Sequence, residues 1–353
     1  MRFTKVRLES IAAHLPERVV PSHELERRLA PVYERLRLSE GRLELMTGIR
    51  ERRHCAPRTR PSSLAIAAAE TALRGVERST IGVVVHASVC RDFLEPATAS
   101  VVQGALGIGF QASGFDLSNA CLGFANAMCL VGGMIERGEI ERGLVVSGED
   151  GAPLVEATIA DLLARPDATR DDLKRAFASL TIGSGGAACV LAREELAPSA
   201  ARLAGATQRS ATEHSGLCQG GQAAGASGPL MHTDSEALLA AGNELAARTY
   251  GEFLREHQLE PAGIERFVTH QVGVAHRRLL LATLGLDPGR DYPTVETLGN
   301  MGSASLPVTL ALAREAGHIL PTHRTALFGI GSGLYCSMLL LEPPEQVNLP
   351  RVQ

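Results

Sequence analysis

Residues 114–133 read GFDLSNACLGFANAMCLVGG, in which a strand-like segment runs directly into small and apolar residues. The pattern from residue 122 to 137 predicts a helix, and Cys121 lies where that helix begins. A thiol at a helix N-terminus is near the positive end of the dipole, which favours the thiolate. Free backbone N–H groups there can also stabilise an oxyanion. The junction therefore favours acyl transfer through Cys121, with a buried structural thiol, as expected for Cys129, as the alternative.

On both sides of this junction, short apolar runs alternate with helical patterns, which indicates an α/β fold. Further helices are expected at 99–108 and 235–257. The runs interpreted as buried strands are IGVVVHASV (81–89), GLVVSGE (143–149), AACVLARE (187–194), RFVTHQ (266–271), TALFGIG (325–331) and CSMLLLE (336–342). Two of these regions resemble each other, TIGSGGAACVLA and FGIGSGLYCSMLLL, which suggests a duplicated unit with halves at 1–196 and 197–353. The glycine- and alanine-rich segment 216–230 predicts a mobile loop between the halves, near a site entrance.

Composition excludes several classes of function. The 353 residues carry a net charge of -4, and no basic run favours nucleic acid as a partner. Seven unevenly spaced cysteines without a CxxC pair indicate reduced thiols rather than disulfides or zinc. We expect no metal and no resident cofactor. Neither a signal-peptide core nor the roughly 20 apolar residues of a membrane span is present, so a cytoplasmic protein is expected.

Two polar residues in the second half are candidate partners for the thiol. His270 ends a predicted buried strand, which is where α/β folds place catalytic groups, although a core histidine bonded to backbone is the ordinary alternative. Asn300 stands in TLGNMGSASLP, before a predicted helix, and its ordinary interpretation is a turn residue. Neither residue is persuasive alone, whereas their order and sequence context together are.

These segments resemble the motifs of β-ketoacyl-ACP synthase III and its relatives in the thiolase superfamily. The matching stretches, in the family's order, are TGIRERR (47–53), SNACLGFANAM (118–128), THQVG (269–273), GNMGSASLP (299–307) and GIGSGLYCSM (329–338). The resemblance implies a thiolase fold, with two similar halves in a five-layered α-β-α-β-α arrangement, and a homodimer. It assigns the family's catalytic roles to Cys121, His270 and Asn300. It also implies that the backbone N–H groups of Cys121 and Ser332 form the oxyanion hole.

A closer likeness is to the OleA group, which joins two long-chain acyl-CoA molecules head to head. The stretch ASVCRDFLEPATASVVQGALG (87–107) resembles that group's RD-aromatic-LEP segment. By this resemblance, Glu95 reaches across the dimer interface and acts as a base in the partner's active site. A solvated loop glutamate is the alternative. A base is needed because condensation without decarboxylation must remove an α-proton.

The chain departs from the family where coenzyme A is bound. The usual Trp and Arg before TGIR fall near Arg42 and Met46, and the HQAN motif reads HQVG here. Arg277 and Arg278 are the candidates that compensate. The expected partners are acyl thioesters carried on coenzyme A or on an acyl carrier protein.

Three other functions stay open at this point. The chain could be a decarboxylating synthase or a ketosynthase that joins two carrier-bound chains. It could instead transfer an acyl group from Cys121 to oxygen or nitrogen. A silent subunit of a heteromeric complex ranks last, because all three members of the catalytic set are present.

Overall fold

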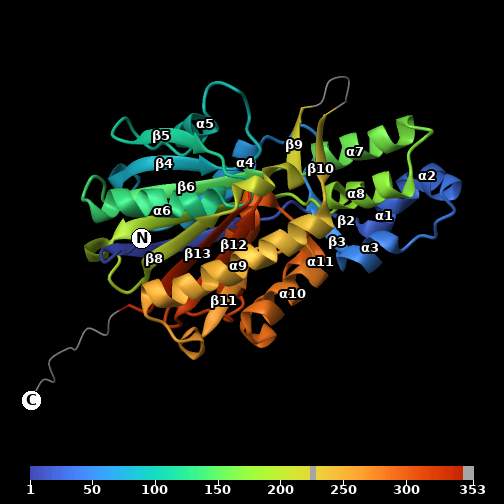
Figure 1. The fold of residues 1–353 in the computed structure, drawn as a ribbon. Helices are drawn as coiled ribbons and strands as arrows, with labels where there is room; N and C mark the ends of the chain where they lie inside the picture. The colour runs from blue at the N-terminus through green and yellow to red at the C-terminus, as the bar shows by residue number, and fades with distance from the viewer. Residues whose placement is uncertain (223–227, 345–353) are drawn as a thin grey trace, which may run out of the picture.

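The computed structural model describes residues 1–222 and 228–344, and its centre is a nine-stranded mixed sheet (Figure 1). The strand order is β11-β12-β13-β8-β1-β7-β6-β4-β5, so the sheet contains both halves of the chain. The strand bounds are β1 Val6–His14, β4 Ile81–Ala87, β5 Ser113–Leu117, β6 Arg142–Glu149, β7 Gly185–Arg193, β8 Ala201–Ser210, β11 Arg266–Thr269, β12 Thr325–Gly331 and β13 Tyr335–Glu342.

The two halves of the sheet repeat one strand order. The strands of the first half run β5-β4-β6-β7-β1, and those of the second half run β11-β12-β13-β8 in the corresponding positions. Among its described residues, the second half has no counterpart of β5; at that place Asp291 makes an isolated parallel bridge to Phe267. The halves meet where β1 pairs with β8. The predicted boundary at 196/197 lies between β7 and β8 and stays a prediction.

Helices cover the sheet in layers. Buried clusters show α6 and α12 packed between the two halves of the sheet, α4 and α5 outside the first half, and α9 and α10 outside the second. Because strands such as β6 are covered on both faces, their sequences read as continuous apolar runs. The bounds of these helices are α4 Pro61–Ala72, α5 Thr98–Ala105, α6 Gly123–Glu136, α9 Ser235–His257, α10 Val274–Leu284 and α12 Ser305–Glu315.

A smaller unit packs at the end of the sheet where β6 and β12 finish. It has its own buried cluster of helical residues. Its elements are α1 Ser22–Arg28, α2 Ala30–Arg35, α3 Arg42–Thr47, α7 Ala152–Ala164 and α8 Arg170–Leu180, together with β2 Arg18–Pro21 and β3 Glu51–His54. Beside it lie α11 (Val295–Leu298) and a hairpin of β9 (Cys218–Gln222) and β10 (Pro229–Thr233).

The predicted elements agree with the structure except at one segment. The six predicted strands and the helix at 235–257 are present. The segment 216–230 was expected to be a loop, but its described ends form the β9–β10 hairpin, while residues 223–227 lie outside the described part. Backbone pairing between the two ends overrides their weak strand propensity. Within the described residues, no helix is long and apolar enough to cross a membrane.

Candidate active site

A cavity of about 340 Å³ lies between the sheet, the smaller unit and α9. It takes residues from both halves of the chain, and apolar side chains dominate its wall. An exposed ion pair between Lys174 and Glu236 lies on its lining. The lining residues are Met46, Thr47, Cys121, Lys174, Phe177, Ala178, Thr181, Cys218, Met231, Thr233, Ser235, Glu236, Leu238, Leu239, His270, Val272, Gly273, Ala275, His276, Asn300, Ile330, Gly331, Ser332 and Leu334.

Cys121 reaches the cavity from a sharp turn between β5 and α6. Ala120 has a φ of 44°, a left-handed conformation that costs free energy for any residue with a Cβ. The turn is closed by a 2.9 Å hydrogen bond from the Leu122 N–H to the Asn119 carbonyl. Across from it, a Cβ at Gly331 would come within 3.0 Å of the Leu122 side chain, so glycine permits the close approach of β12. The two half-domains therefore meet at this thiol.

The Cys121 thiol is neutral in the structure. Burial, with smaller contributions from Cys218 and Glu149, raises its pKa to about 12. The helix N-terminus favours the thiolate, whereas desolvation of the charged form, the largest cause of this shift, favours the thiol. The thiol must therefore lose its proton during the reaction rather than before it.

His270 follows β11 directly and lines the same cavity. Its backbone N–H donates to the Phe328 carbonyl at 2.8 Å, which fixes the residue at the end of the sheet. The side chain is 5% exposed, and both ring nitrogens lack partners among the described residues. Burial, with a smaller effect of His276, lowers its pKa to about 3. At neutral pH the ring is uncharged, so it can donate a hydrogen bond from one nitrogen and accept a proton on the other.

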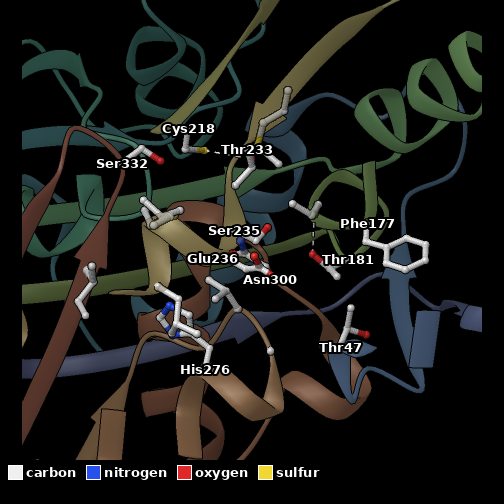
Figure 2. Close-up of a pocket in the computed structure, with 18 of the residues that line it drawn as sticks. Thr47, Phe177, Thr181, Cys218, Thr233, Ser235, Glu236, His276, Asn300 and Ser332 are labelled. Carbon is white, nitrogen blue, oxygen red and sulfur yellow. Dashed lines mark hydrogen bonds between the residues drawn. The ribbon is translucent and has the colours of Figure 1, made fainter. Parts of the chain in front are cut away.

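Asn300 is held by bonds to both its backbone and its side chain. Its N–H donates to Thr181 and its carbonyl accepts from Gly183, which ties the turn to the first half of the chain. The side-chain Oδ1 accepts from the Gly302 N–H at 3.0 Å and from the Ser305 hydroxyl at 3.3 Å. With the oxygen occupied, the amide NH₂ is the group left to donate toward the cavity. Figure 2 shows Asn300 at the centre of the lining, with His276 nearby in this view.

Ser332 completes the predicted set on the cavity wall. It follows β12 and lies, with Cys218, toward one side of the cavity in Figure 2, while Phe177 and Thr47 lie toward the other. The structure thus brings Cys121, His270, Asn300 and Ser332 together, although nearly 150 residues separate the first two. Their catalytic roles stay predictions.

Glu95 does not reach this cavity within one chain. It lies in the segment 88–97 between β4 and α5, where it is exposed. Apolar side chains of the same segment are exposed with it, Val89 to 54% and Leu94 to 90%. An exposed apolar cluster of this kind is typical of a contact surface.

Arg277 and Arg278 also stay outside the cavity lining. The Arg277 Nε donates to the Asp291 carboxylate at 2.5 Å, and the Asp291 side chain is fully buried. Arg277 thus has a structural partner: it neutralises the buried Asp291 carboxylate, which would destabilise the fold if it had no partner. Arg278 is exposed on α10. Their predicted part in substrate binding stays a prediction.

Other cavity residues were missed by the sequence argument. Cys218 accepts a hydrogen bond from the Thr233 hydroxyl at 3.5 Å, and both line the wall from the open end of the β9–β10 hairpin. His276, six residues after His270, is a second neutral imidazole, its pKa lowered to about 4 by burial. Phe177 contributes from α8. Only His276 gave a usable signal, since a histidine near the start of a helix beside a strand end is a common site position.

The arrangement is suited to acyl transfer. A thiol lies in one apolar cavity with a neutral imidazole and a carboxamide whose NH₂ has no partner among the described residues, so a proton can move from the thiol to the imidazole and back without a change in the net charge of the site. The apolar wall excludes water from an acyl intermediate. Backbone N–H groups at the turn before α6 can donate to an oxyanion.

Comparison with known proteins supports the same fold and chemistry. Family models for 3-oxoacyl-[acyl-carrier-protein (ACP)] synthase III and for its C-terminal part match residues 115–210 and 254–342. The acyl-CoA:acyl-CoA alkyltransferase of Shewanella oneidensis is 40% identical over 347 residues, covering 96% of this chain and 99% of the relative.

Solved structures agree over nearly the whole chain. Cerulenin-bound OleA of Xanthomonas campestris matches with a TM-score of 0.91 and 37% identity, covering 97% of this chain and 98% of that one. A 3-oxoacyl-(acyl carrier protein) synthase III of Xanthomonas oryzae matches with a TM-score of 0.91 and 38% identity, covering 97% and 100%. Variants of the same OleA in which a cysteine, a histidine or a glutamate is replaced match equally well. The predicted thiolase fold is confirmed.

Proposed function

This chain belongs to the 3-oxoacyl-[acyl-carrier-protein] synthase III family, and on that premise we propose that it joins two long-chain acyl-CoA molecules by a non-decarboxylating Claisen condensation. It is an acyltransferase of this condensing group. The product is a β-keto acid or its thioester. The observation that carries the proposal is the meeting of a thiol, a neutral imidazole and a carboxamide with a free NH₂ in one apolar cavity.

The first half-reaction loads the enzyme. The Cys121 sulfur attacks the thioester carbonyl of the first acyl-CoA, and its proton passes to the neutral ring of His270. The N–H groups of Cys121 and Ser332 donate to the tetrahedral oxyanion. Collapse breaks the bond to coenzyme A, whose sulfur takes the proton back from His270. The cysteine thus carries the acyl chain and the imidazole is neutral again.

The second half-reaction forms the carbon–carbon bond. The carbonyl oxygen of the second acyl-CoA accepts hydrogen bonds from Asn300 and His270, which stabilise an enolate. A base removes one α-proton, and the resulting carbanion attacks the carbonyl carbon of the Cys121 thioester. Expulsion of the Cys121 sulfur, which takes up the proton that the base removed, releases the β-ketoacyl thioester.

We assign the base to Glu95 of the partner subunit in a homodimer. Two features support a dimer that brings the segment 88–97 to a second copy: its exposed apolar side chains, and the exposed edge strand β5 beside it. A carboxylate transferred from water into an apolar cavity becomes a stronger base, because desolvation raises its pKa. The glutamate variants of Xanthomonas campestris OleA concern the same residue type.

The donor and the compartment belong to the same proposal. Coenzyme A is the carrier named for the Shewanella relative, whereas the family models name an acyl carrier protein. We propose coenzyme A, with acyl carrier protein as the second candidate. All seven cysteines are free thiols, which fits a reducing compartment such as the cytoplasm. No resident cofactor enters the scheme, since the chain's own groups move every proton in it.

One incubation separates the proposal from its alternatives. Purified protein is mixed with a long-chain acyl-CoA as the sole substrate, and products are identified by mass spectrometry. A β-keto product of twice the chain length supports the proposal. A product that appears only after malonyl thioester is added indicates a decarboxylating synthase, and acyl-Cys121 without any carbon–carbon product indicates transfer to another acceptor.

Two variants divide the half-reactions. Cys121→Ala is expected to show no acyl adduct by intact mass. Glu95→Ala is expected to keep acylation and to lose about 10²–10⁴-fold in condensation, the usual contribution of an acid–base group. Glu70→Ala, an exposed glutamate of α4, is the matched control. Normal condensation by Glu95→Ala would remove that residue from the mechanism.

A further inference from the structure

Glu149, the last residue of β6, is a buried carboxylate with three backbone donors. The residue is 4% exposed. Its Oε1 accepts from the N–H of Val89 at 2.9 Å and from that of Ser303 at 3.0 Å. Its Oε2 accepts from the N–H of Cys90 at 3.1 Å. Burial raises its pKa, and these three hydrogen bonds oppose that shift by stabilising the charged form.

The three donors belong to different parts of the proposed machinery. Val89 and Cys90 begin the segment 88–97 that carries Glu95. Ser303 stands three residues after Asn300, in the turn before α12. The Ser303 hydroxyl in turn accepts the N–H of Phe124 at 2.8 Å, in the first turn of α6 after Cys121. One carboxylate is therefore bonded to two of the catalytic segments and, through Ser303, linked to the third.

We propose that Glu149 is a positioning residue that fixes the 88–97 segment and the Asn300 turn relative to the helix that follows Cys121. The assignment rests on the proposed function for the roles of those three segments. Glu149 does not line the cavity. Beyond its small contribution to the raised pKa of Cys121, it acts through the segments that it holds.

Only a carboxylate meets the demands of this position. Three N–H groups point at it, and a carboxylate is the side chain that presents two acceptor oxygens and no donor. In Glu149→Gln, the amide NH₂ has to face at least one of the three N–H groups and leaves it unpaired in a buried place. Glu149 also packs closely against Gly302, where a Cβ would lie 3.0 Å from Oε1. The fewest bonds are lost when the NH₂ takes the place of Oε2 and faces the Cys90 N–H, so the 88–97 segment loosens more than the Asn300 turn in the glutamine variant, without a change in side-chain size.

Such loosening should affect condensation more than acylation. Acylation uses Cys121, His270 and the oxyanion hole. Condensation additionally needs Asn300 on the enolate and Glu95 as the base. A shift of about 1 Å in a positioned group can cost about 10²-fold in rate. Glu149→Gln is thus expected to slow condensation far more than acylation.

The test measures both half-reactions and the two segments themselves. With long-chain acyl-CoA as substrate, Glu149→Gln should lower condensation about 10²-fold while Cys121 acylation, followed by intact mass, stays within about threefold of the wild type. Hydrogen–deuterium exchange should increase in peptides that cover 89–97 more than in those that cover 300–303. Ser303→Ala removes only the link to Phe124, so it should slow acylation and leave exchange in 89–97 unchanged. Glu70→Gln is the control with no expected effect.

Specific outcomes overturn the proposal. Equal loss of acylation and condensation, in step with a fall in the folded fraction, means that Glu149 has a structural role alone. Unchanged exchange in both segments means that it holds neither. If the wild type forms no carbon–carbon bond, the proposed function fails, but the exchange experiment still decides the role of Glu149. Should Glu149→Gln not fold, Glu149→Asp keeps the charge while withdrawing it by one methylene, and the same split between half-reactions is expected.

Discussion

The reactivity of Cys121 should increase with pH across the whole neutral and alkaline range. Burial raises its pKa to about 12 from an ordinary value of 9.0. A thiol attacks as the thiolate, so a raised pKa leaves less of the reactive form at every pH below 12. Each unit of pH should increase the alkylation rate about tenfold, without a plateau near neutrality.

The size of the effect follows from the same shift. At pH 8 an ordinary thiol is about 10% thiolate and Cys121 about 0.01%, a thousandfold difference. The more basic thiolate is intrinsically more nucleophilic, which recovers about 15- to 30-fold over three pKa units. Cys121 should therefore react about 30- to 60-fold more slowly than a free thiol of ordinary pKa.

Alkylation by excess iodoacetamide, followed by intact mass between pH 6 and 10, measures this directly. The Cys121→Ala variant supplies the background from the other cysteines, of which Cys218 lines the same cavity. Restricted access slows the reaction equally at every pH, so the slope is the decisive quantity. A plateau at or below pH 8 would indicate a preformed thiolate–imidazolium pair and would refute the reasoning. His270 should add no step between pH 5 and 9, because burial lowers its pKa to about 3.

Three further predictions concern single side chains. Arg277→Met leaves the buried Asp291 carboxylate unpaired, so the free energy of unfolding in urea should fall by about 3–5 kcal/mol; a raised KM for acyl-CoA with unchanged stability would contradict this. Gly148→Ala places a Cβ 1.9 Å from the Pro61 carbonyl oxygen and should cost about 1–3 kcal/mol or more, visible as a lower Tm. Asn300→Ala removes an enolate donor and should reduce condensation about 10²–10³-fold with acylation kept; an equal loss in both steps argues against that role.

The sequence predicted the buried strands well, because strands covered on both faces consist of continuous apolar residues. The strands at 81–87 and 325–331 are of this kind. It missed β1 and β8, whose sequences mix charged, polar and small residues. These two strands join the halves of the sheet. Their position depends on pairing with distant strands, which no local pattern reveals.

For the site, family motifs indicated which residues converge but not their protonation. The thiol, the imidazole and the carboxamide meet in one cavity as expected. A helix N-terminus, which favours a thiolate, is visible in a sequence, whereas the burial that raises the pKa of Cys121 is not. Arg277 shows the same limit. Its partner Asp291 lies fourteen residues further along the chain, and the two side chains meet only because α10 packs against the end of the sheet at β11. Glu149 was overlooked because its three donors come from segments far apart in the sequence.

The unequal edges of the central sheet limit how copies of this protein can add to one another. At one edge, Asp291 bridges to Phe267 and its carboxylate accepts the Thr269 N–H, so the outward backbone of β11 is occupied. At the other edge, β5 pairs only with β4 within the described chain. When two molecules pair through β5, the β5 edge of each molecule is occupied by the other. Growth by sheet extension therefore stops after one addition and does not continue into a filament.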